Sequence, residues 1–409
     1  MENIALIAPN TQNGQISVKN LTAPAAGKQN RLSSLERELV YLAITLRIFF
    51  LAIITLRSFK TIKKAYNSLL RLRKATWNGQ IKKIHKVDGK YYFNLYTPGW
   101  PSTAYDQTIK SELLRYAAPT QIGGDKLRFI FFAITRKCPL NCEHCFEWDN
   151  LNKKETFTLD ELKQVVSLYQ AQGVNQIQFS GGEPLVRFKD LVEVIRFASS
   201  SCECYIITSG FNLTQKNALL LKDAGCKGII ISIDHYMPHL HNNFRGDQGI
   251  FDTAVAGVKA AIDAGMVTAV SICVTGDFID GGHLLPYLEF AQELGVHFVQ
   301  ILEPKDIGRY AGKSVLLEER HIQQLEDFFK IMNHSPAYKD FPTLMYHGYH
   351  QRRVGCYAGS RSLYIDSAGN VNACPFCHTH SYNIRNILDS AQKVLPVKEN
   401  LCPRYEDIA

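Results

Sequence analysis

The most constraining feature of the sequence is a regular alternation of apolar, strand-like runs with helix-like runs between residues 127 and 335. The first strand-like run is LRFIFFAIT, and the helix-like run TLDELKQVVSLYQAQG begins at the capping residue Thr158 and ends at Gly173. Six such alternations with short connections predict an α/β fold whose parallel sheet curls into a partial, TIM-like (β/α)6 barrel. Reactive groups in such barrels lie on loops that follow the strands, so we expect the functional residues there.

Three cysteines come directly after the first predicted strand, in the loop Cys138-Pro-Leu-Asn-Cys142-Glu-His-Cys145. Thiolates at this spacing on one loop suit three corners of a cubic iron–sulfur cluster. Since no fourth cysteine is near, one iron would stay open for a ligand. Zinc is the alternative, because Cys and His144 are both zinc ligands, but zinc motifs usually combine paired short spacings into four ligands. The spacing therefore favours an iron–sulfur cluster as the catalytic centre.

Polar turns follow the next predicted strands. The turn after the second strand is Ser180-Gly181-Gly182-Glu183-Pro184, in which the glycines allow the backbone to approach a ligand and Glu183 can accept from an amine. Ser209 ends the third predicted strand, and Ser232 and Asp234 end the fourth. Together with the cysteine loop, these turns predict one site at one end of the barrel.

The cysteine loop, with the aromatic Phe146 beside its last cysteine, resembles the signature of the radical S-adenosylmethionine (SAM) superfamily over about residues 127–335. The resemblance implies an oxidoreductase in which the three cysteines hold a [4Fe-4S] cluster. SAM would bind the open iron and be cleaved reductively to a 5′-deoxyadenosyl radical that abstracts hydrogen from the substrate. An external electron donor of the flavodoxin or ferredoxin type is also implied.

The same resemblance implies a set of cofactor-binding residues: Gly181, Gly182, Glu183, Pro184, Ser209, Ser232, Asp234 and Arg245. The first four are similar to the Gly-Gly-Glu-Pro element that binds the methionine amino group of SAM. Ser232 and Asp234 stand where family members present polar groups to the ribose. Arg245 is expected to meet the methionine carboxylate, and a helix-capping or surface role is its alternative. Glu303, at the end of the sixth predicted strand, is a candidate polar wall.

A second cysteine group follows the barrel, in residues 336–409, and consists of Cys356, Cys374, Cys377 and Cys402. LYIDSAGNV, between the first two, predicts two short strands about a turn that brings their thiols together. The group resembles the one-cluster "twitch" extension of radical SAM enzymes rather than the longer "SPASM" form, and it implies one auxiliary [4Fe-4S] cluster. Structural zinc is the competitor, because a four-cysteine site suits either metal. The remaining four cysteines lie in apolar or helix-like segments and are predicted to be core residues.

The N-terminal part of the chain predicts attachment to a membrane. Residues 1–30 are polar and predicted as a flexible tail. Within residues 31–75, the apolar run Leu39–Leu56, broken by Arg47, is about 27 Å long as a helix and suits a bilayer of roughly 30 Å. A basic amphipathic stretch follows it, which favours an anionic surface and places the rest of the chain at the cytoplasmic face. A buried helix of a soluble protein is the alternative.

Charge supports a membrane partner over a nucleic acid. The net charge is +8, yet Lys28 to Lys90 alone contain fifteen Lys and Arg against three Asp and Glu, so the barrel region is mildly acidic. Residues 76–126 form a linker region in which KVDGKYYFNLYTP predicts a hairpin about Asp-Gly. We expect no nucleic-acid partner.

The sequence leaves the substrate open. The auxiliary extension favours modification of a peptide or protein, whereas the N-terminal segment favours a lipid or lipid-linked sugar at the membrane. A non-catalytic metal-binding scaffold is a third alternative, which the intact cysteine loop and the Gly-Gly-Glu-Pro element disfavour.

Overall fold

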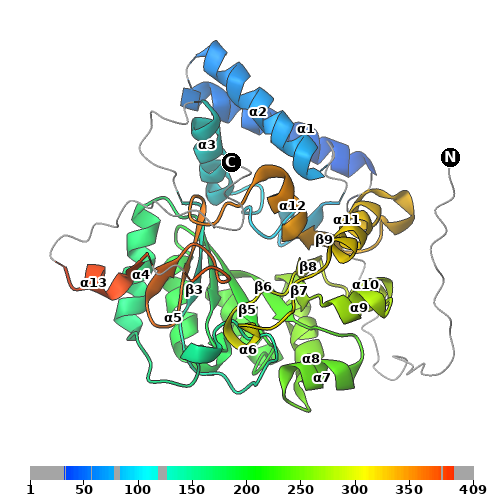
Figure 1. Ribbon diagram of the computed structural model, residues 1–409. Coiled ribbons are helices and arrows are strands. Elements are labelled where there is room, and N and C mark those ends of the chain that lie inside the picture. The colour runs from blue at the N-terminus through cyan, green and yellow to red at the C-terminus, as the bar shows by residue number, and fades with distance from the viewer. Residues whose placement is uncertain are drawn as a thin grey trace.

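The computed structural model describes residues 32, 34–56, 58–77, 83–117, 127–378 and 381–390 (Figure 1). The predicted tail over residues 1–30 lies outside these ranges, and so does Cys402.

A ten-stranded sheet forms the centre of the described part of the chain. Its central parallel strands follow one another in sequence order, as a repeated strand–helix alternation requires. These strands are β3 (Phe129–Ala133), β4 (Gln176–Ser180), β5 (Glu203–Thr208), β6 (Cys226–Ser232), β7 (Val267–Cys273) and β8 (Phe298–Leu302). The predicted α/β fold with a parallel, partial-barrel sheet is confirmed.

Strands from the C-terminal part of the chain extend both edges of this sheet. β9 (Thr343–Tyr346) pairs in parallel with β8, and β10 (Ser362–Ile365) pairs in parallel with β3. β11 (Asn370–Asn372) and β12 (Tyr382–Asn383) continue antiparallel from β10. The hairpin predicted over LYIDSAGNV is therefore confirmed as β10 and β11, and it places the second cysteine group beside the strand that precedes the first.

Helices connect the strands and cover the sheet, and their apolar faces pack on it to form the main core. Thr158 caps the first of them as predicted, because its Oγ1 accepts from the Glu161 N–H at 3.3 Å and the Glu161 carboxylate accepts from the Thr158 N–H at 2.7 Å. Such a capping box contributes about 1 kcal/mol. The helices are α4 (Leu159–Ala171), α5 (Phe188–Ala198), α6 (Gln215–Asp223), α7 (Pro238–Arg245), α8 (Ile250–Asp263), α9 (Gly276–Asp280), α10 (Leu284–Glu293), α11 (Glu319–His334), α12 (His347–Val354) and α13 (Ile384–Leu388).

The predicted linker region fills the barrel interior at one end. It contains the expected hairpin, β1 (His85–Val87) with β2 (Lys90–Tyr92), joined by Asp88 and Gly89 in left-handed conformations. Its side chains form an apolar cluster with inward-facing residues of the strands. The cluster consists of Val87, Tyr92, Leu95, Tyr205, Ile230, Val267, Ala269, Phe298 and Met345.

Polar contacts seal the same end. The Leu95 carbonyl accepts from the side-chain amides of Gln176 and Gln178 at 3.1 and 3.2 Å, and the Glu203 carboxylate accepts from the Gly99 N–H at 3.2 Å. Gln176 and Glu203 are the first residues of β4 and β5, and Gln178 is the middle residue of β4. The linker thus covers the amino ends of β4 and β5, and the predicted functional loops emerge at the opposite, carboxyl end.

The N-terminal helices α1 (Ser34–Leu56) and α2 (Phe59–Trp77) lie across one end of the molecule and pack on α3 (Thr103–Ala117) (Figure 1). Within the described residues, α1 is the one helix long and apolar enough to cross a membrane, which is weak evidence for a span. Arg47, in its middle, forms an ion pair with Asp106 of α3, with its Nε 3.2 Å from Asp106 Oδ1. The charge of Arg47, which interrupts the apolar run, is therefore paired with a carboxylate of a neighbouring helix.

Candidate functional site

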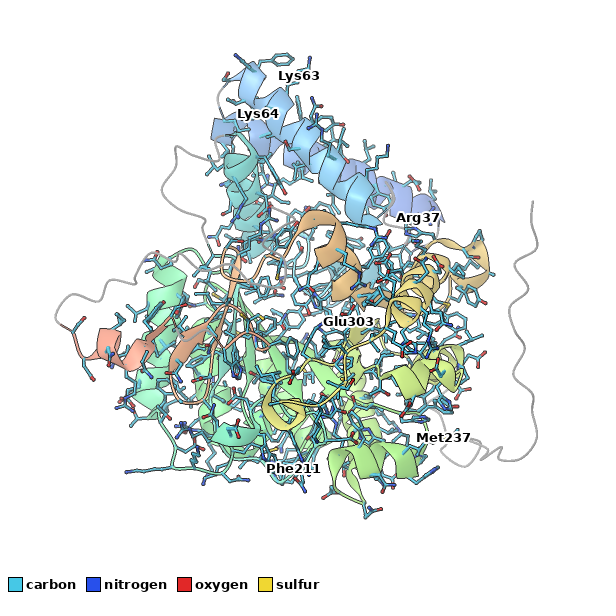
Figure 2. The ribbon with its side chains drawn as sticks, in the orientation of Figure 1. Arg37, Lys63, Lys64, Phe211, Met237 and Glu303 are labelled. Carbon is cyan, nitrogen blue, oxygen red and sulfur yellow. The ribbon has the colours of Figure 1, made fainter. Side chains whose placement is uncertain are left out.

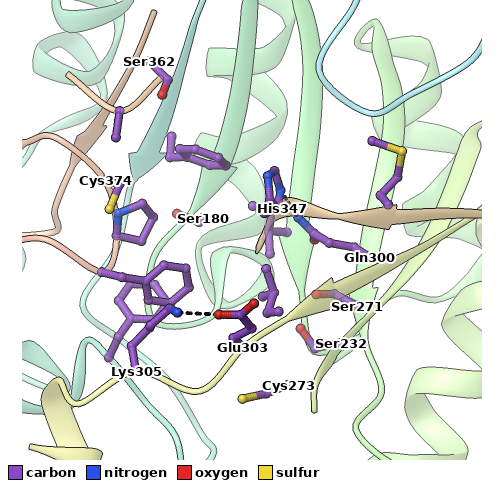
Figure 3. A pocket seen from close by; sticks show the side chains of 18 of the residues that line it. Ser180, Ser232, Ser271, Cys273, Gln300, Glu303, Lys305, His347, Ser362 and Cys374 are labelled. Carbon is purple, nitrogen blue, oxygen red and sulfur yellow. Dashed lines mark hydrogen bonds and ion pairs between the residues drawn. The ribbon is translucent and has the colours of Figure 1, made fainter. Parts of the chain in front are cut away.

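A cavity of about 480 Å³ opens at the carboxyl end of the barrel (Figure 3). Both predicted cysteine groups reach it, together with the glycine turn and the polar residues that end β5, β6 and β8. The predicted site residues that line it are Cys138, Cys142, Cys145, Gly181, Gly182, Glu183, Ser209, Ser232, Asp234, Arg245, Glu303, Cys356 and Cys374. Pro184 begins a short 3-10 helix beside it. The structure thus gathers residues spread over more than two hundred positions of sequence into one pocket.

The first three cysteines pack together in the loop after β3, against Leu140 and Ile250. Burial raises the pKa of the Cys138 and Cys145 thiols to about 12, so these side chains need bound metal to exist as thiolates at neutral pH. His144, the possible zinc ligand, stacks on Phe244 with ring centroids 4.8 Å apart. Three thiols from one loop fit three irons of a cubic cluster.

Backbone from three other segments approaches the cysteine loop too closely for any side chain. A Cβ at Gly182 would lie 2.4 Å from the Lys137 carbonyl oxygen, and one at Gly246 would lie 2.8 Å from the Asn141 carbonyl oxygen. A Cβ at Gly308 would lie 2.3 Å from the Cys145 carbonyl oxygen. Glycine at these positions lets the loop be held from several sides. The sequence analysis identified Gly182 and missed the role of Gly308, which lies far along the chain.

Asn152 and Arg309 fix the shape of the loop, and sequence reasoning missed both. Asn152, at φ 58°, accepts from the Cys138 N–H and donates to the Cys138 carbonyl, each at 3.1 Å. Arg309 donates to the Asn141 carbonyl at 2.7 Å and to the Cys142 carbonyl at 3.2 Å. An asparagine in a short polar turn is a weak signal for such a contact, and Arg309 carries no local signal.

Glu183 is buried and joins the ends of β4 and β5. Its Oε1 accepts from Thr208 Oγ1 at 2.6 Å and from the Leu185 N–H at 3.0 Å. Its Oε2 accepts from the Ser209 N–H at 2.8 Å and from Ser209 Oγ at 2.7 Å. A carboxylate offers about four lone-pair sites, and these donors match that number. Burial raises the pKa of this carboxyl group. Contact of Glu183 with a cofactor amine stays a prediction.

Asp234 and Arg245 form a buried ion pair next to the first cysteine group. Arg245 Nε lies 2.6 Å from Asp234 Oδ2, and its Nη1 lies 3.6 Å from Cys142 Sγ. The Cys273 N–H donates to Asp234 Oδ1 at 3.0 Å. Burial alone would raise the pKa of Asp234, but the Arg245 guanidinium holds it below its usual value. The pair therefore presents a fixed positive charge to the sulfur of Cys142, and roles toward a ribose or a methionine carboxylate stay predictions.

Cys356, Cys374 and Cys377 pack as a second group with Ala358 and Ala373. Cys374 and Cys377 face each other across a short bridge, with the Cys377 N–H donating to the Cys374 carbonyl at 3.1 Å. Among the described residues, no three His, Cys, Asp or Glu side chains gather tightly enough to hold a single metal ion. A four-iron cluster takes one thiolate per iron, so its ligands are spread around it.

Glu303 and the groups that donate to it form a charged wall of the pocket that both cysteine groups reach. Glu303 accepts from Lys305 Nζ, from Arg352 Nη1 and from Tyr346 Oη at 2.7 to 2.8 Å, and Figure 3 shows its contact with Lys305. Burial alone would raise the pKa of Glu303, but the two cations lower it to about 2. Glu303 lines the pocket, in agreement with the prediction that it is a polar residue of the pocket wall. Cys273, predicted as a core residue, is buried and also lines the pocket.

The chain is similar to several known proteins. Residues 132–291 match the family model described as the radical SAM superfamily. An AdoMet-dependent heme synthase of Oleidesulfovibrio alaskensis is 27% identical over 316 residues, which are 70% of this chain and 80% of the synthase. A GTP 3′,8-cyclase of Xanthomonas campestris pv. campestris is 29% identical over 204 residues, and the match spans 48% of this chain and 60% of the cyclase.

The fold agrees with a solved structure as well. SuiB of Streptococcus suis, solved bound to the precursor peptide SuiA, superposes with a TM-score of 0.52 at 12% identity. The superposition covers 73% of this chain and 74% of SuiB.

Proposed function

Since this chain belongs to the radical SAM superfamily and is an enzyme that uses a [4Fe-4S] cluster and SAM, we propose that it modifies a peptide or protein. In this proposal Cys138, Cys142 and Cys145 hold the catalytic cluster. When bound, the cluster and SAM supply one-electron cleavage of a carbon–sulfur bond of SAM and abstraction of a hydrogen atom from the substrate. The proposal does not include the third alternative, a non-catalytic metal-binding scaffold.

The protein's own residues have three tasks. The loop held by Asn152 and Arg309 keeps the thiols in place, and the close approaches at Gly182 and Gly308 leave no side chain between the loop and its neighbours. Arg245 sets a positive charge beside a cysteine sulfur, which stabilises an anionic cluster. The linker covers the amino ends of β4 and β5, which limits the access of water to reactive species from that side.

The observation that carries the peptide proposal is the continuity of the pocket between the two cysteine groups. Cys138 and Cys145 line one part, Cys356 and Cys374 line another, and the charged wall around Glu303 lies in the same cavity. The cavity volume of about 480 Å³ lies within the range of about 300–1,000 Å³ that is usual for ligand sites. SuiB was solved with a peptide, but a likeness at this identity supports the fold alone.

A lipid or lipid-linked sugar is the second candidate. Its support is α12, which lines the pocket with His347 and Val354 and also packs against α2 of the apolar and basic N-terminal helices.

Isotope transfer tests both candidates. The reconstituted enzyme, with dithionite and SAM, is incubated separately with the peptide fraction and the lipid extract of cells grown in deuterated medium, and 5′-deoxyadenosine is analysed by mass spectrometry. We expect deuterium in 5′-deoxyadenosine with the peptide fraction only. Deuterium with the lipid extract only would refute the peptide proposal and favour the second candidate. The variant with all three loop cysteines changed to alanine is the control and should release no 5′-deoxyadenosine from any mixture.

A further inference from the structure

The outer side of α1 is an exposed apolar surface. Its side chains recur every three or four residues along the helix, and each is at least 45% exposed. They are Leu35, Leu39, Leu42, Leu46, Phe49, Phe50, Ile53 and Ile54. Next to them, α2 exposes Phe59, Tyr66 and Leu70. We call these eleven residues the docking face. Soluble proteins rarely expose so many large apolar side chains together, and such patches mark an interaction site.

The opposite side of α1 is packed against the rest of the protein. Val40 and Ile44 are buried with Ile84 and Tyr105. Further along the helix, Leu51 and Ala52 are buried in a second cluster that includes Leu113 of α3. If α1 spanned the bilayer, these contacts would have to enter the hydrocarbon or be broken. The same holds for the Asp106 carboxylate that pairs with Arg47. The packing therefore favours α1 lying in the plane of a membrane surface.

The charge beside the docking face selects its partner. α2 carries six Lys and Arg and no Asp or Glu within Phe59–Trp77. Lys60, Lys63 and Arg71 are exposed, and Figure 2 places Lys63 at the outer edge of the molecule, with Glu303 of the pocket further in. A second copy docking through this face would bring like charges together, which is unfavourable. Anionic phospholipid headgroups complement the charge, and the acyl region accepts the apolar side chains.

We infer that α1 and α2 dock the protein in-plane on an anionic lipid bilayer, with the docking face buried at the headgroup boundary. This geometry has a consequence for the pocket, because α12 packs against α2 and also lines the cavity. The membrane surface then lies next to the pocket wall formed by α12. The inference concerns attachment and holds for a peptide substrate or a lipid substrate.

Vesicle flotation of the full-length protein tests the docking face. We expect flotation with vesicles of phosphatidylcholine containing phosphatidylglycerol, and weaker flotation with phosphatidylcholine alone. The variant Leu42→Ser/Leu46→Ser/Phe49→Ser should lose flotation, while its matched control at exposed apolar positions of the barrel region, Phe197→Ser/Leu219→Ser/Leu316→Ser, should keep it. Equal flotation of both variants would overturn the inference.

Charge reversal tests the lipid preference. Lys60→Glu/Lys63→Glu/Arg71→Glu should lower partitioning onto anionic vesicles by more than about 100-fold, because the loss of three attractive contacts of about 1 kcal/mol each already gives that factor and the new carboxylates add repulsion. Its control, Lys189→Glu/Lys216→Glu/Lys259→Glu, changes exposed lysines elsewhere and should have little effect. Light scattering measures the oligomeric state in parallel. If the wild type is a dimer that does not bind vesicles, and the Leu42→Ser/Leu46→Ser/Phe49→Ser variant is a monomer, the docking face binds a second copy of the chain and the lipid assignment is refuted.

Labelling from one side of sealed vesicles distinguishes an in-plane helix from a spanning one. Glu38→Cys introduces a thiol near the start of α1, at an exposed polar position outside the docking face. An impermeant maleimide added outside should modify that peptide, as shown by mass spectrometry, when the barrel is also outside. Protection of the peptide until detergent is added would mean that α1 spans the bilayer.

Discussion

Replacing Glu183 by glutamine tests whether this carboxylate organises the site or contacts the cofactor directly. In the structure, two backbone N–H groups and two hydroxyls donate to it, from Leu185, Thr208 and Ser209. Glutamine has the same shape but replaces one acceptor oxygen with an NH2 group that can only donate. In either orientation of the amide, the N–H of Leu185 or of Ser209 then faces another donor.

The expected loss of stability follows from the one backbone N–H that is left without an acceptor. The hydroxyls can rotate and accept from the new NH2, whereas a backbone N–H cannot. A buried donor left without an acceptor costs about 1–3 kcal/mol. Loss of the charge has an opposite effect, because burial raises the pKa of Glu183 and the neutral amide avoids that penalty. We expect a net loss near 2 kcal/mol, or a fall in melting temperature of about 4 °C for a domain of this size.

Thermal unfolding of the apoprotein, without SAM, measures this loss, and Glu289→Gln, at an exposed position of α10, is the matched control. SAM binding to the reconstituted protein is measured in parallel. A variant that keeps its melting temperature but binds SAM at least tenfold more weakly would show that the carboxylate contacts the ammonium group, as the sequence analysis predicted, because a charge-assisted contact contributes about 1.5–3 kcal/mol. That result would refute the organising role argued from the structure.

Three further predictions concern the metal sites and the charged wall. Anaerobically reconstituted protein should bind about eight irons, and changing Cys138, Cys142 and Cys145 to alanine should halve that number by iron analysis; one zinc with only four irons would instead make the second site structural. Asn152→Ala should lower iron loading of the first site relative to the control Asn217→Ala on α6, because it removes both hydrogen bonds to Cys138 and a residue suited to positive φ; unchanged loading would contradict the role of Asn152 in fixing the loop. Glu303, whose pKa is lowered to about 2 from 4.5, contributes about 3 kcal/mol of stability that is present above pH 4.5 and lost as the pH falls toward 2. Between pH 5 and pH 3.5 the urea midpoint should therefore fall more in the wild type than in Glu303→Gln, and parallel curves would refute the assignment.

Local patterns were sufficient for much of the fold. The run LRFIFFAIT contains β3, and the alternation predicted the six parallel strands in their order, because apolar runs bounded by caps and glycines are set by neighbouring residues. The Asp88-Gly89 turn and the capping box at Thr158 were predictable for the same reason. The grouping of Cys138, Cys142 and Cys145 was predictable because the three residues lie within eight positions of one loop.

Contacts between distant segments were not predictable. Gln176 and Gln178 are fully buried polar residues of a strand, and their amides have a partner only because Leu95 enters the barrel from the linker. Arg47 interrupts an apolar run, and its partner Asp106 lies 59 positions away. A pattern of residue types gives no information on which remote group meets such side chains.

The relation between the two cysteine groups depends on contacts of this kind. Phe146, which the sequence marked only as the aromatic beside the last cysteine, packs on Phe376 with ring centroids 5.6 Å apart, and Phe376 lies between Cys374 and Cys377. Next to Phe146, the Glu147 carboxylate accepts from Tyr364 Oη at 2.5 Å and from Ser367 Oγ at 3.1 Å, which are on β10 and the turn after it. Because β10 is hydrogen-bonded to β3, the strand that carries the first loop, both groups are attached to one rigid part of the sheet. Their separation is therefore fixed by packing rather than by a linker, and a substrate held in the cavity between them has a defined position relative to each.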